Sequence, residues 1–331
     1  MTSPRRASRL TLLLPFLLVG LALAAWTVWW FVLARQVETR AEARIAALTA
    51  AGWTVETAPL SVDGWPFRVR LDLGRAAITA PSGHGLETPR LIAQANAWAP
   101  LTWVAIAPED LTLTRPDKGR IRIAGDGARL SLAGIDRPWP HLAVELIRPV
   151  FTPVGSAEAF PLSRAERVTL EAKPAAGGRD AVEVLFGMVE ARGRAGGPVE
   201  GVTGSGLLTA RVELRLEGAA ALRTPSDDGL LAGWSRAGGR FSRIRGALES
   251  GDSRATIESE ALSAAEDGRL EGRLALRADR PATVVAGLAG APGPAVEAAG
   301  AVDRDVALTL EFRDGRAWLG PFAVAPAPRL F

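Results

Sequence analysis

The feature that most constrains this chain is an uninterrupted apolar stretch over residues 10–34, which holds no charged side chain. As an α-helix, these 25 residues would extend about 37 Å, enough to cross a hydrocarbon core of about 30 Å. The apolar core of a secretory signal peptide is shorter, usually about 7–15 residues. We therefore predict a transmembrane helix at residues 10–34. The alternative is a signal peptide cleaved near residues 32–34, which weakly resemble a cleavage site.

Three tryptophans stand near the end of this stretch. Trp26, Trp29 and Trp30 are spaced i, i+3 and i+4, so a helix would place them on one face. Indole rings favour the boundary between hydrocarbon and water. We therefore predict that these tryptophans mark a membrane–water interface.

The flanking charges predict the orientation of the helix. Arg5, Arg6 and Arg9 precede it without any acidic residue, and cytoplasmic flanks of transmembrane helices are enriched in Arg and Lys. Arginines also follow the helix, which weakens this bias. We expect residues 1–9 to form a cytoplasmic tail and residues 52–331 to be exported.

Composition excludes several function classes. The chain has no cysteine, so thiolate zinc sites, iron–sulfur clusters and cysteine nucleophiles are ruled out. The net charge of +3 equals the charge of the three N-terminal arginines, so the rest of the chain is close to neutral. The pI of about 10.3 reflects the predominance of Arg and the lack of Tyr and Cys. We therefore predict no nucleic-acid partner.

Candidate reactive groups are few and scattered. His84 and His141 are far apart, and the pair Asp303 and Asp305 encloses Arg304, which favours an ordinary strand edge over a metal site. Nothing assembles a nucleophile, a base and an orienting group. We predict no catalytic residues, no metal and no cofactor, and hence a protein that is not an enzyme.

The hydrophobic pattern changes along the exported part. Residues 35–51 carry a narrow apolar stripe at helical spacing, which predicts a helical neck ended by Gly52. From Trp53 onward the period is two, as in residues 142–146, 182–186 and 212–216. Such alternation is typical of half-buried strands in antiparallel sheets.

Turn residues suggest where strands reverse. Asp126-Gly127 predicts a two-residue hairpin that pairs Ile123 with Leu130 and Ile121 with Leu132. Asp267-Gly268 predicts a second such loop, with Ala265, Ser263, Ala261 and Ile257 on the face of Leu270, Leu274 and Leu276. An odd loop centred on Gly315 would pair Phe312 with Trp318, Leu308 with Phe322 and Val306 with Val324.

Short helices and one linker complete the predicted organisation. Ser226 would cap a helix at 227–236, with Leu230, Leu231 and Trp234 inward and residues 238–239 as its stop. A second short helix is expected at 282–288. The Gly-rich stretch 192–206 is either a loop within one sheet or a linker between two halves, 52–191 and 207–331.

Three stretches together resemble a known family. They are the apolar helix leading to Gly52-Trp53, the motif Gly64-Trp65-Pro66-Phe67-Arg68, and the C-terminal Gly320-Pro321-Phe322 with Pro326 and Pro328. Their order resembles the bacterial envelope family called domain of unknown function 2125, over nearly the whole chain. That family is similar in architecture to AsmA-type envelope proteins, which are anchored by one helix and implicated in lipid handling. The resemblance implies a single-pass protein of the bacterial inner membrane with a periplasmic body. From the residues alone, the motif at 64–68 is a structural corner rather than a binding site.

We predict a mainly β fold behind one transmembrane helix, with a large antiparallel domain and a few short helices. The domain is either a closed sandwich or a curved, taco-like sheet with an apolar trough. The favoured function is a non-catalytic envelope protein that binds or handles lipid. The alternative is a scaffold that binds another envelope protein, and the third is a hydrolase of envelope polymers. The predicted trough residues are Leu214, Val306, Leu308, Leu310, Phe312 and Trp318.

Overall fold

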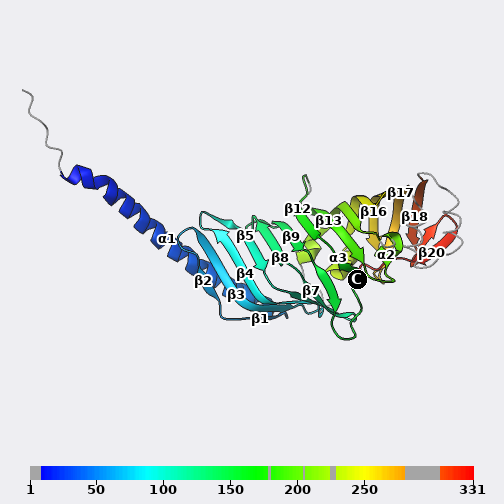
Figure 1. Cartoon of the computed structure of the whole chain (residues 1–331), viewed down its shortest axis with the longest axis horizontal. Coiled ribbons are helices and arrows are strands. Elements are labelled where there is room, and N and C mark those ends of the chain that lie inside the picture. Colours follow the sequence, from blue (N-terminus) through cyan, green and yellow to red (C-terminus); the bar gives the residue numbers. More distant parts are fainter. Residues whose placement is uncertain (1–8, 178–179, 204–205, 224–228, 280–305) are drawn as a thin grey trace, which may run out of the picture.

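The fold consists of one long helix followed by one antiparallel sheet, as seen in a computed structural model that describes residues 9–177, 180–203, 206–223, 229–279 and 306–331. The helix projects from one end of the body, and the colours of the body run from the N-terminal strands beside the helix to the C-terminal strands at the far end (Figure 1). Within the described residues the strands form a single sheet of 20 strands. This architecture confirms the prediction of a mainly β, antiparallel domain behind an apolar N-terminal helix.

The N-terminal helix is one unbroken element. Helix α1 spans Arg9–Ala50, so the predicted membrane segment and the predicted neck are continuous. Gly52 follows its last turn with a φ of +85°, a conformation that favours glycine, and ends the helix as predicted.

The strands form a meander in which most strands pair with a neighbour along the chain. Their bounds are β1 Thr54–Thr57, β2 Ser61–Asp63, β3 Arg68–Thr79, β4 Gly85–Asn96, β5 Ala99–Ala107, β6 Leu111–Arg115, β7 Gly119–Ala124, β8 Ala128–Ala133, β9 His141–Ile147, β10 Val150–Pro153, β11 Leu162–Arg164, β12 Arg167–Pro174, β13 Ala181–Gly193, β14 Leu208–Glu217, β15 Arg240–Ser250, β16 Ser253–Ala264, β17 Leu270–Ala278, β18 Val306–Arg313, β19 Arg316–Leu319 and β20 Phe322–Pro326.

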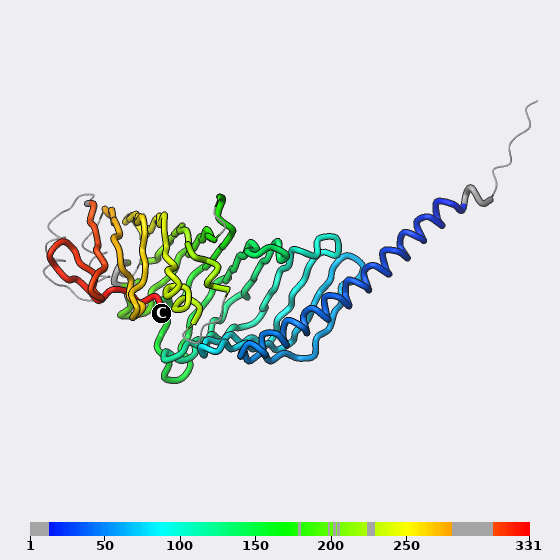
Figure 2. The backbone as a smooth tube through the Cα atoms, turned by 180° about the vertical axis from the view of Figure 1, so that it is seen from behind, coloured from blue at the N-terminus to red at the C-terminus, as the bar shows by residue number. Residues whose placement is uncertain are grey.

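Four pairs of short strands are in effect four long strands that bend in the middle. Strand β4 pairs with β5 near Ile92 and with β6 near Leu86, so β5 and β6 lie end to end along it. Strands β7 and β8, β9 and β10, and β11 and β12 likewise lie end to end, each pair forming the two halves of one bent strand. The bends divide this part of the sheet into a first wall (β5, β8, β9 and β12) and a second wall (β6, β7, β10 and β11). Both walls end on β4 and β13, which gives the folded sheet seen in Figure 2.

One of these bends corrects the prediction for Asp126-Gly127. Ile123 pairs with Leu111 rather than with Leu130, because β7 belongs to the second wall and β8 to the first. Gly127 has a φ of +108°, and a Cβ there would lie 2.9 Å from the carbonyl oxygen of Ala107. The dipeptide therefore bends a strand instead of reversing it.

The two C-terminal turns also differ from the expected registers. A hairpin does form at Asp267-Gly268, but Ala264 faces Leu270 and Ser263 faces Glu271, which moves Ser263 to the other face. Ile257 pairs with Leu276 as predicted.

The turn at Gly315 has two residues rather than an odd number. Asp314 and Gly315 both have positive φ, and Arg313 pairs with Arg316. Phe312 therefore faces Ala317, and Trp318 moves to the opposite face. Further along β18, Leu308 pairs with Leu276 rather than Phe322, and Val306 pairs with Ala278 rather than Val324.

Short helices pack against the sheet near β13, β14 and β15. Helix α3 spans Leu230–Arg236, and its Trp234 is fully buried as predicted. Leu230 was expected inward but is 52% exposed. Gly238, with a φ of +82°, follows the end of this helix as expected. Helix α2 spans Pro198–Thr203 and the 3₁₀ helix η1 spans Ala219–Arg223. The predicted cap Ser226 and the predicted helix at 282–288 lie outside the described residues.

The sheet crosses the Gly-rich stretch 192–206 without interruption. Strands β13 and β14 pair from Ala181 opposite Glu217 to Ala191 opposite Leu208. The two parts of the body on either side are therefore joined by continuous backbone hydrogen bonds.

Candidate functional site

The most distinctive feature of the body is a row of apolar residues that crosses twelve strands. Each member pairs directly with the next across neighbouring strands, and no polar side chain interrupts the row. The members are Leu71, Ala93, Ala105, Leu130, Val144, Leu170, Phe186, Val212, Gly246, Ile257, Leu276 and Leu308. We call this set the apolar row.

Parallel rows on either side are also apolar. Side chains two residues away along each strand share the same face. On one side Trp103, Leu132, Leu142, Ala172, Val184 and Leu214 pair in succession. On the other side Leu146, Val168, Met188, Ala210 and Leu248 do the same. The apolar face is thus several residues wide.

The exposure of the apolar row changes along its length. Leu71 and Leu276, near its two ends, are buried. The members between them are half-buried, and Leu170 is 38% exposed. A side chain in the core of a closed sandwich would be covered by the opposite sheet. The middle of the apolar row is therefore only partly covered.

Two parts of the protein cover some of the apolar face, namely the second wall and the helices α3 and η1. The second wall packs against the first through a cluster around Ile121 and Phe151. At the C-terminal part, α3 and η1 pack through a cluster around Trp234, which includes Leu214 and Leu216. The ring of Trp234 lies 4.8 Å from that of Phe241, and its indole N–H donates to the carbonyl oxygen of Glu217 at 2.8 Å.

The carboxylate of Glu217 strengthens this covering cluster. The hydroxyl of Ser242 donates to it at 2.7 Å, and Nε of Arg240 donates at 2.8 Å. These hydrogen bonds, first from Ser242 and then from Arg240, lower the pKa of Glu217 below its ordinary value. The carboxylate therefore stays charged to a lower pH than an ordinary glutamate does.

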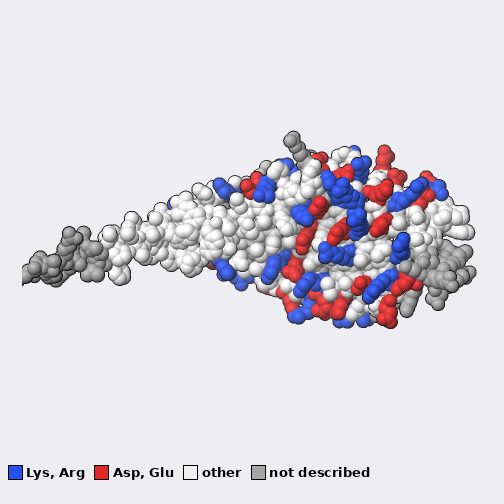
Figure 3. All heavy atoms as spheres, turned by 90° about the horizontal axis from the view of Figure 1, so that it is seen from above, with Lys and Arg blue, Asp and Glu red and all other residues white. Residues whose placement is uncertain are grey.

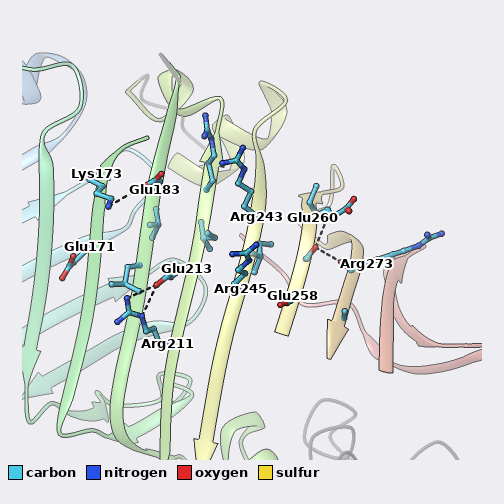
Figure 4. Close-up of a pocket in the computed structure, with 18 of the residues that line it drawn as sticks. Glu171, Lys173, Glu183, Arg211, Glu213, Arg243, Arg245, Glu258, Glu260 and Arg273 are labelled. Carbon is cyan, nitrogen blue, oxygen red and sulfur yellow. Dashed lines mark hydrogen bonds and ion pairs between the residues drawn. The ribbon is translucent and has the colours of Figure 1, made fainter. Parts of the chain in front are cut away.

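The opposite face of the sheet is polar. Along the pairing register it carries Glu171, Glu213, Arg245 and Glu258, each one residue away from a member of the apolar row. A hollow of about 1140 Å³ lies on this face, lined by acidic and basic side chains together with uncharged residues such as Leu185 and Ser259 (Figure 4). Within it Lys173 pairs with Glu183 at 3.3 Å, and Arg211 with Glu213 at 2.8 Å. Charged side chains gather over the C-terminal part of the body, whereas the N-terminal part presents a largely uncharged surface (Figure 3).

The predicted trough residues lie at the C-terminal part of the body and differ in their surroundings. Leu308 is the last member of the apolar row and is half-buried. Leu310 and Phe312 are 1% and 6% exposed and belong to a closed cluster, which Leu214 also contacts. Val306 pairs with Ala278, but its side chain lies outside the described set.

Trp318 is a correction to the predicted trough. It pairs with Glu311, so it lies on the polar face, where the guanidinium of Arg313 stacks 4.5 Å from the centre of its ring. The even turn at Asp314-Gly315 is the cause, because adding or removing one turn residue inverts the faces of the following strand.

Sequence reasoning missed the middle of the apolar row, including Leu130, Val144, Leu170 and Phe186. The strands of Val144 and Phe186 were predicted from the alternation of apolar and polar residues, and that of Leu130 from the Asp126-Gly127 turn. No strand was predicted around Leu170, which lies in β12. That these residues align across strands depends on registers set by the bends, which alternation alone does not reveal.

The predicted interface tryptophans and the motif at 64–68 meet at the junction of helix and body. The indole N–H of Trp26 donates to the carbonyl oxygen of Pro66 at 2.9 Å, and that of Trp30 donates to Arg68 at 2.8 Å. Trp30 is 4% exposed, whereas Trp29 is 40% exposed. Only Trp29 of the three is thus turned largely away from the body.

Gly64 opens the corner that the motif forms. Its φ is +104°, and a Cβ there would lie 2.8 Å from the carbonyl oxygen of Arg68. Its own carbonyl oxygen accepts a hydrogen bond from the backbone N–H of Arg68 at 2.9 Å. The side chains of Trp65 and Phe67 are 49% and 64% exposed.

The scattered reactive groups are not brought together. His84 contacts the hydroxyl of Ser82 at 3.1 Å on the surface, and His141 is exposed at the start of β9. Among the described residues, no group of three or more His, Asp or Glu side chains could hold a metal ion. Asp303 and Asp305 lie outside those residues.

Comparison with known proteins identifies a family. The model of the family described as "Uncharacterized protein conserved in bacteria (DUF2125)" matches residues 30–328, and the chain therefore belongs to this family. No curated protein and no solved structure matches the chain.

Proposed function

We propose that this member of the DUF2125 family is a non-catalytic, membrane-anchored envelope protein that holds lipid acyl chains against its apolar row. The observation that carries this proposal is the half-buried middle of the row, with Leu170 at 38% exposure. Acyl chains would remove this surface from water, a gain of roughly 25 cal/mol for each Å² of apolar area buried.

The dimensions of the apolar row suit an extended ligand. Twelve strands spaced about 4.8 Å apart give a row of about 50 Å along the sheet. Ala93 and Ala105 along the row have small side chains, which leave space above the sheet, whereas the side chain of Ile257 lies over Gly246. A flexible, purely apolar chain needs no specific polar partner, and none is present in the row.

The anchor supports a location at a membrane. Helix α1 is long and apolar enough to cross a membrane, with 6% of its most apolar window buried inside the protein. We infer that it spans the bacterial inner membrane, with the short N-terminal tail in the cytoplasm and the body in the periplasm. A single anchor before a curved antiparallel meander is also in keeping with the likeness to AsmA-type envelope proteins.

The test is a matched pair of charge insertions on β12. Leu170→Asp places a carboxylate on the apolar row, and Thr169→Asp places the same charge one residue away, on the opposite face. Native mass spectrometry of detergent-extracted protein should detect bound lipid in the parent and in Thr169→Asp, and much less in Leu170→Asp. Melting temperatures show whether both variants keep the fold.

Two outcomes would contradict the proposal. The first is a parent protein that carries no lipid after extraction. The second is a Leu170→Asp variant that retains as much lipid as the parent while both remain folded.

A scaffold that binds another envelope protein is the second candidate. The observation in its favour is the charged hollow on the polar face, where Arg243 and Arg245 lie beside Glu258 and Glu260 (Figure 4). Arg243→Glu combined with Arg245→Glu should then abolish capture of that partner in a cross-linking experiment and leave lipid binding intact.

A further inference from the structure

Four large apolar side chains are exposed where the body meets α1. They are Trp65, Phe67, Trp98 and Leu101, with exposed fractions of 49%, 64%, 60% and 47%. Trp65 and Phe67 lie in the β2–β3 loop, Trp98 in the β4–β5 turn and Leu101 at the start of β5. We call these four residues the apolar tip.

The two loops of the apolar tip are joined to each other and to the helix. The backbone N–H of Ala97 donates to the carbonyl oxygen of Phe67 at 2.9 Å. Ala97 and Val69, both buried, pack against Trp30 and Ala34 of α1. The apolar tip is therefore fixed beside the helix rather than carried on a free loop.

The position of this contact along α1 sets its depth in a membrane. If the hydrocarbon core begins at Leu10, Trp26 lies about 24 Å and Trp30 about 30 Å along the helix axis. The core itself is about 30 Å thick. The body thus contacts α1 at and just below the predicted hydrocarbon boundary, and the contact continues beyond it through Ala34 and Val37.

Backbone carbonyl groups at this contact have hydrogen-bond partners other than water. The carbonyl oxygens of Pro66 and Arg68 accept hydrogen bonds from the indole N–H groups of Trp26 and Trp30. Carbonyl groups without such partners would be costly to remove from water. Within the described part of the chain, no ion pair involves the exposed guanidinium of Arg68, which leaves it available to lipid phosphates.

We propose that the apolar tip is inserted into the membrane leaflet on the side of the body, so that the body is held by the membrane at a second contact besides α1. Strand β3 leads from this tip to Leu71, the first member of the apolar row. The proposal rests on the membrane anchor of the proposed function, but it does not depend on lipid binding by the apolar row.

The absence of cysteine from the chain allows a direct test of depth. Phe67→Cys and Trp98→Cys are each labelled with a nitrobenzoxadiazole fluorophore in the full-length protein. Val189→Cys, 43% exposed on β13 and away from α1, is the matched control. Each labelled protein is reconstituted into phosphatidylcholine–phosphatidylglycerol vesicles with and without a lipid that carries a spin label on its acyl chain.

We expect strong quenching and a blue-shifted emission at positions 67 and 98, and neither effect at 189. Equal, weak quenching at all three positions would overturn the proposal. Because these side chains are exposed, the variants should keep the parent melting temperature, and Leu101→Cys replaces any that does not. Leu170→Cys reports separately on the apolar row, so quenching at 170 without quenching at 67 and 98 rejects the tip and retains lipid binding.

Discussion

At the scale of single residues, Glu217 connects three elements around the cover of the apolar face. Its carboxylate binds Ser242 and Arg240 of β15, and its carbonyl oxygen binds Trp234 of α3. Because Ser242 and Arg240 lower the pKa of this carboxylate in the folded state, they stabilise the fold at pH values above the ordinary pKa of 4.5. This contribution is lost as the pH falls through the lowered pKa.

We therefore predict that Glu217→Gln reduces the acid sensitivity of the body. The parent should lose unfolding free energy between pH 7 and pH 3, and the variant should lose less, since Gln does not titrate. Urea denaturation at the two pH values measures the difference.

Glu213→Gln provides the matched control on the same strand. The ion pair of Glu213 with Arg211 is exposed on both sides, so it should contribute little to stability. This control should keep the pH dependence of the parent. If Glu217→Gln also keeps it in full, Glu217 is not a determinant of acid stability.

At the scale of elements, the bends that create the two walls depend on backbone conformations that few residues tolerate. Gly127 is the clearest case, because its positive φ coincides with the close approach of the Ala107 carbonyl. Gly127→Ala should lower the unfolding free energy by about 1–3 kcal/mol, since the new Cβ must displace backbone as well as adopt a strained conformation.

Gly251→Ala separates the two contributions. Gly251 has a φ of +57° in the β15–β16 turn, with nothing within 4 Å of a Cβ, so only the left-handed penalty of about 1 kcal/mol applies. Thermal and urea unfolding of both variants test this order. A larger loss for Gly251→Ala would mean that the bend at Gly127 relaxes easily.

The same bends explain which elements the sequence could predict. Helix α1 and the strands were predictable because the periods of 3.6 and 2 follow from local geometry. Asp-Gly was expected to form a hairpin at 126–127, whereas it does so at Asp314-Gly315, where both residues have positive φ. The Asp-Gly dipeptide favours a positive φ both at 126–127 and at 314–315. Whether the chain then reverses or only bends depends on the strands already beside it, here β6 and β10.

At the scale of the whole molecule, the sequence could predict that strands have an apolar face, but not which apolar residues line up across the sheet. Alternation in β12 and β13 shows that Leu170 and Phe186 share a face with their apolar neighbours. That they also align with Val144 and Val212 follows from the register of four strands. In the sequence, the C-terminal residues Leu310 and Phe312 show the same alternation as the members of the apolar row. They are buried because the two turns after β18 fold β19 and β20 back over them.

The orientation of the molecule in the membrane is the remaining prediction at this scale. Arg5, Arg6 and Arg9 should hold the N-terminus in the cytoplasm. An alkaline phosphatase fused after Phe331 requires export to be active, so this fusion should be active in cells. A fluorescent protein that matures only in the cytoplasm should be dark at the same position and bright when fused before Met1. The reverse pattern would place the body in the cytoplasm.

Replacing the three arginines with Glu should shift part of the population towards that reversed orientation, because arginines at 35, 40 and 44 would then carry the only positive flank. If this triple variant leaves both reporters unchanged, the N-terminal arginines do not set the orientation.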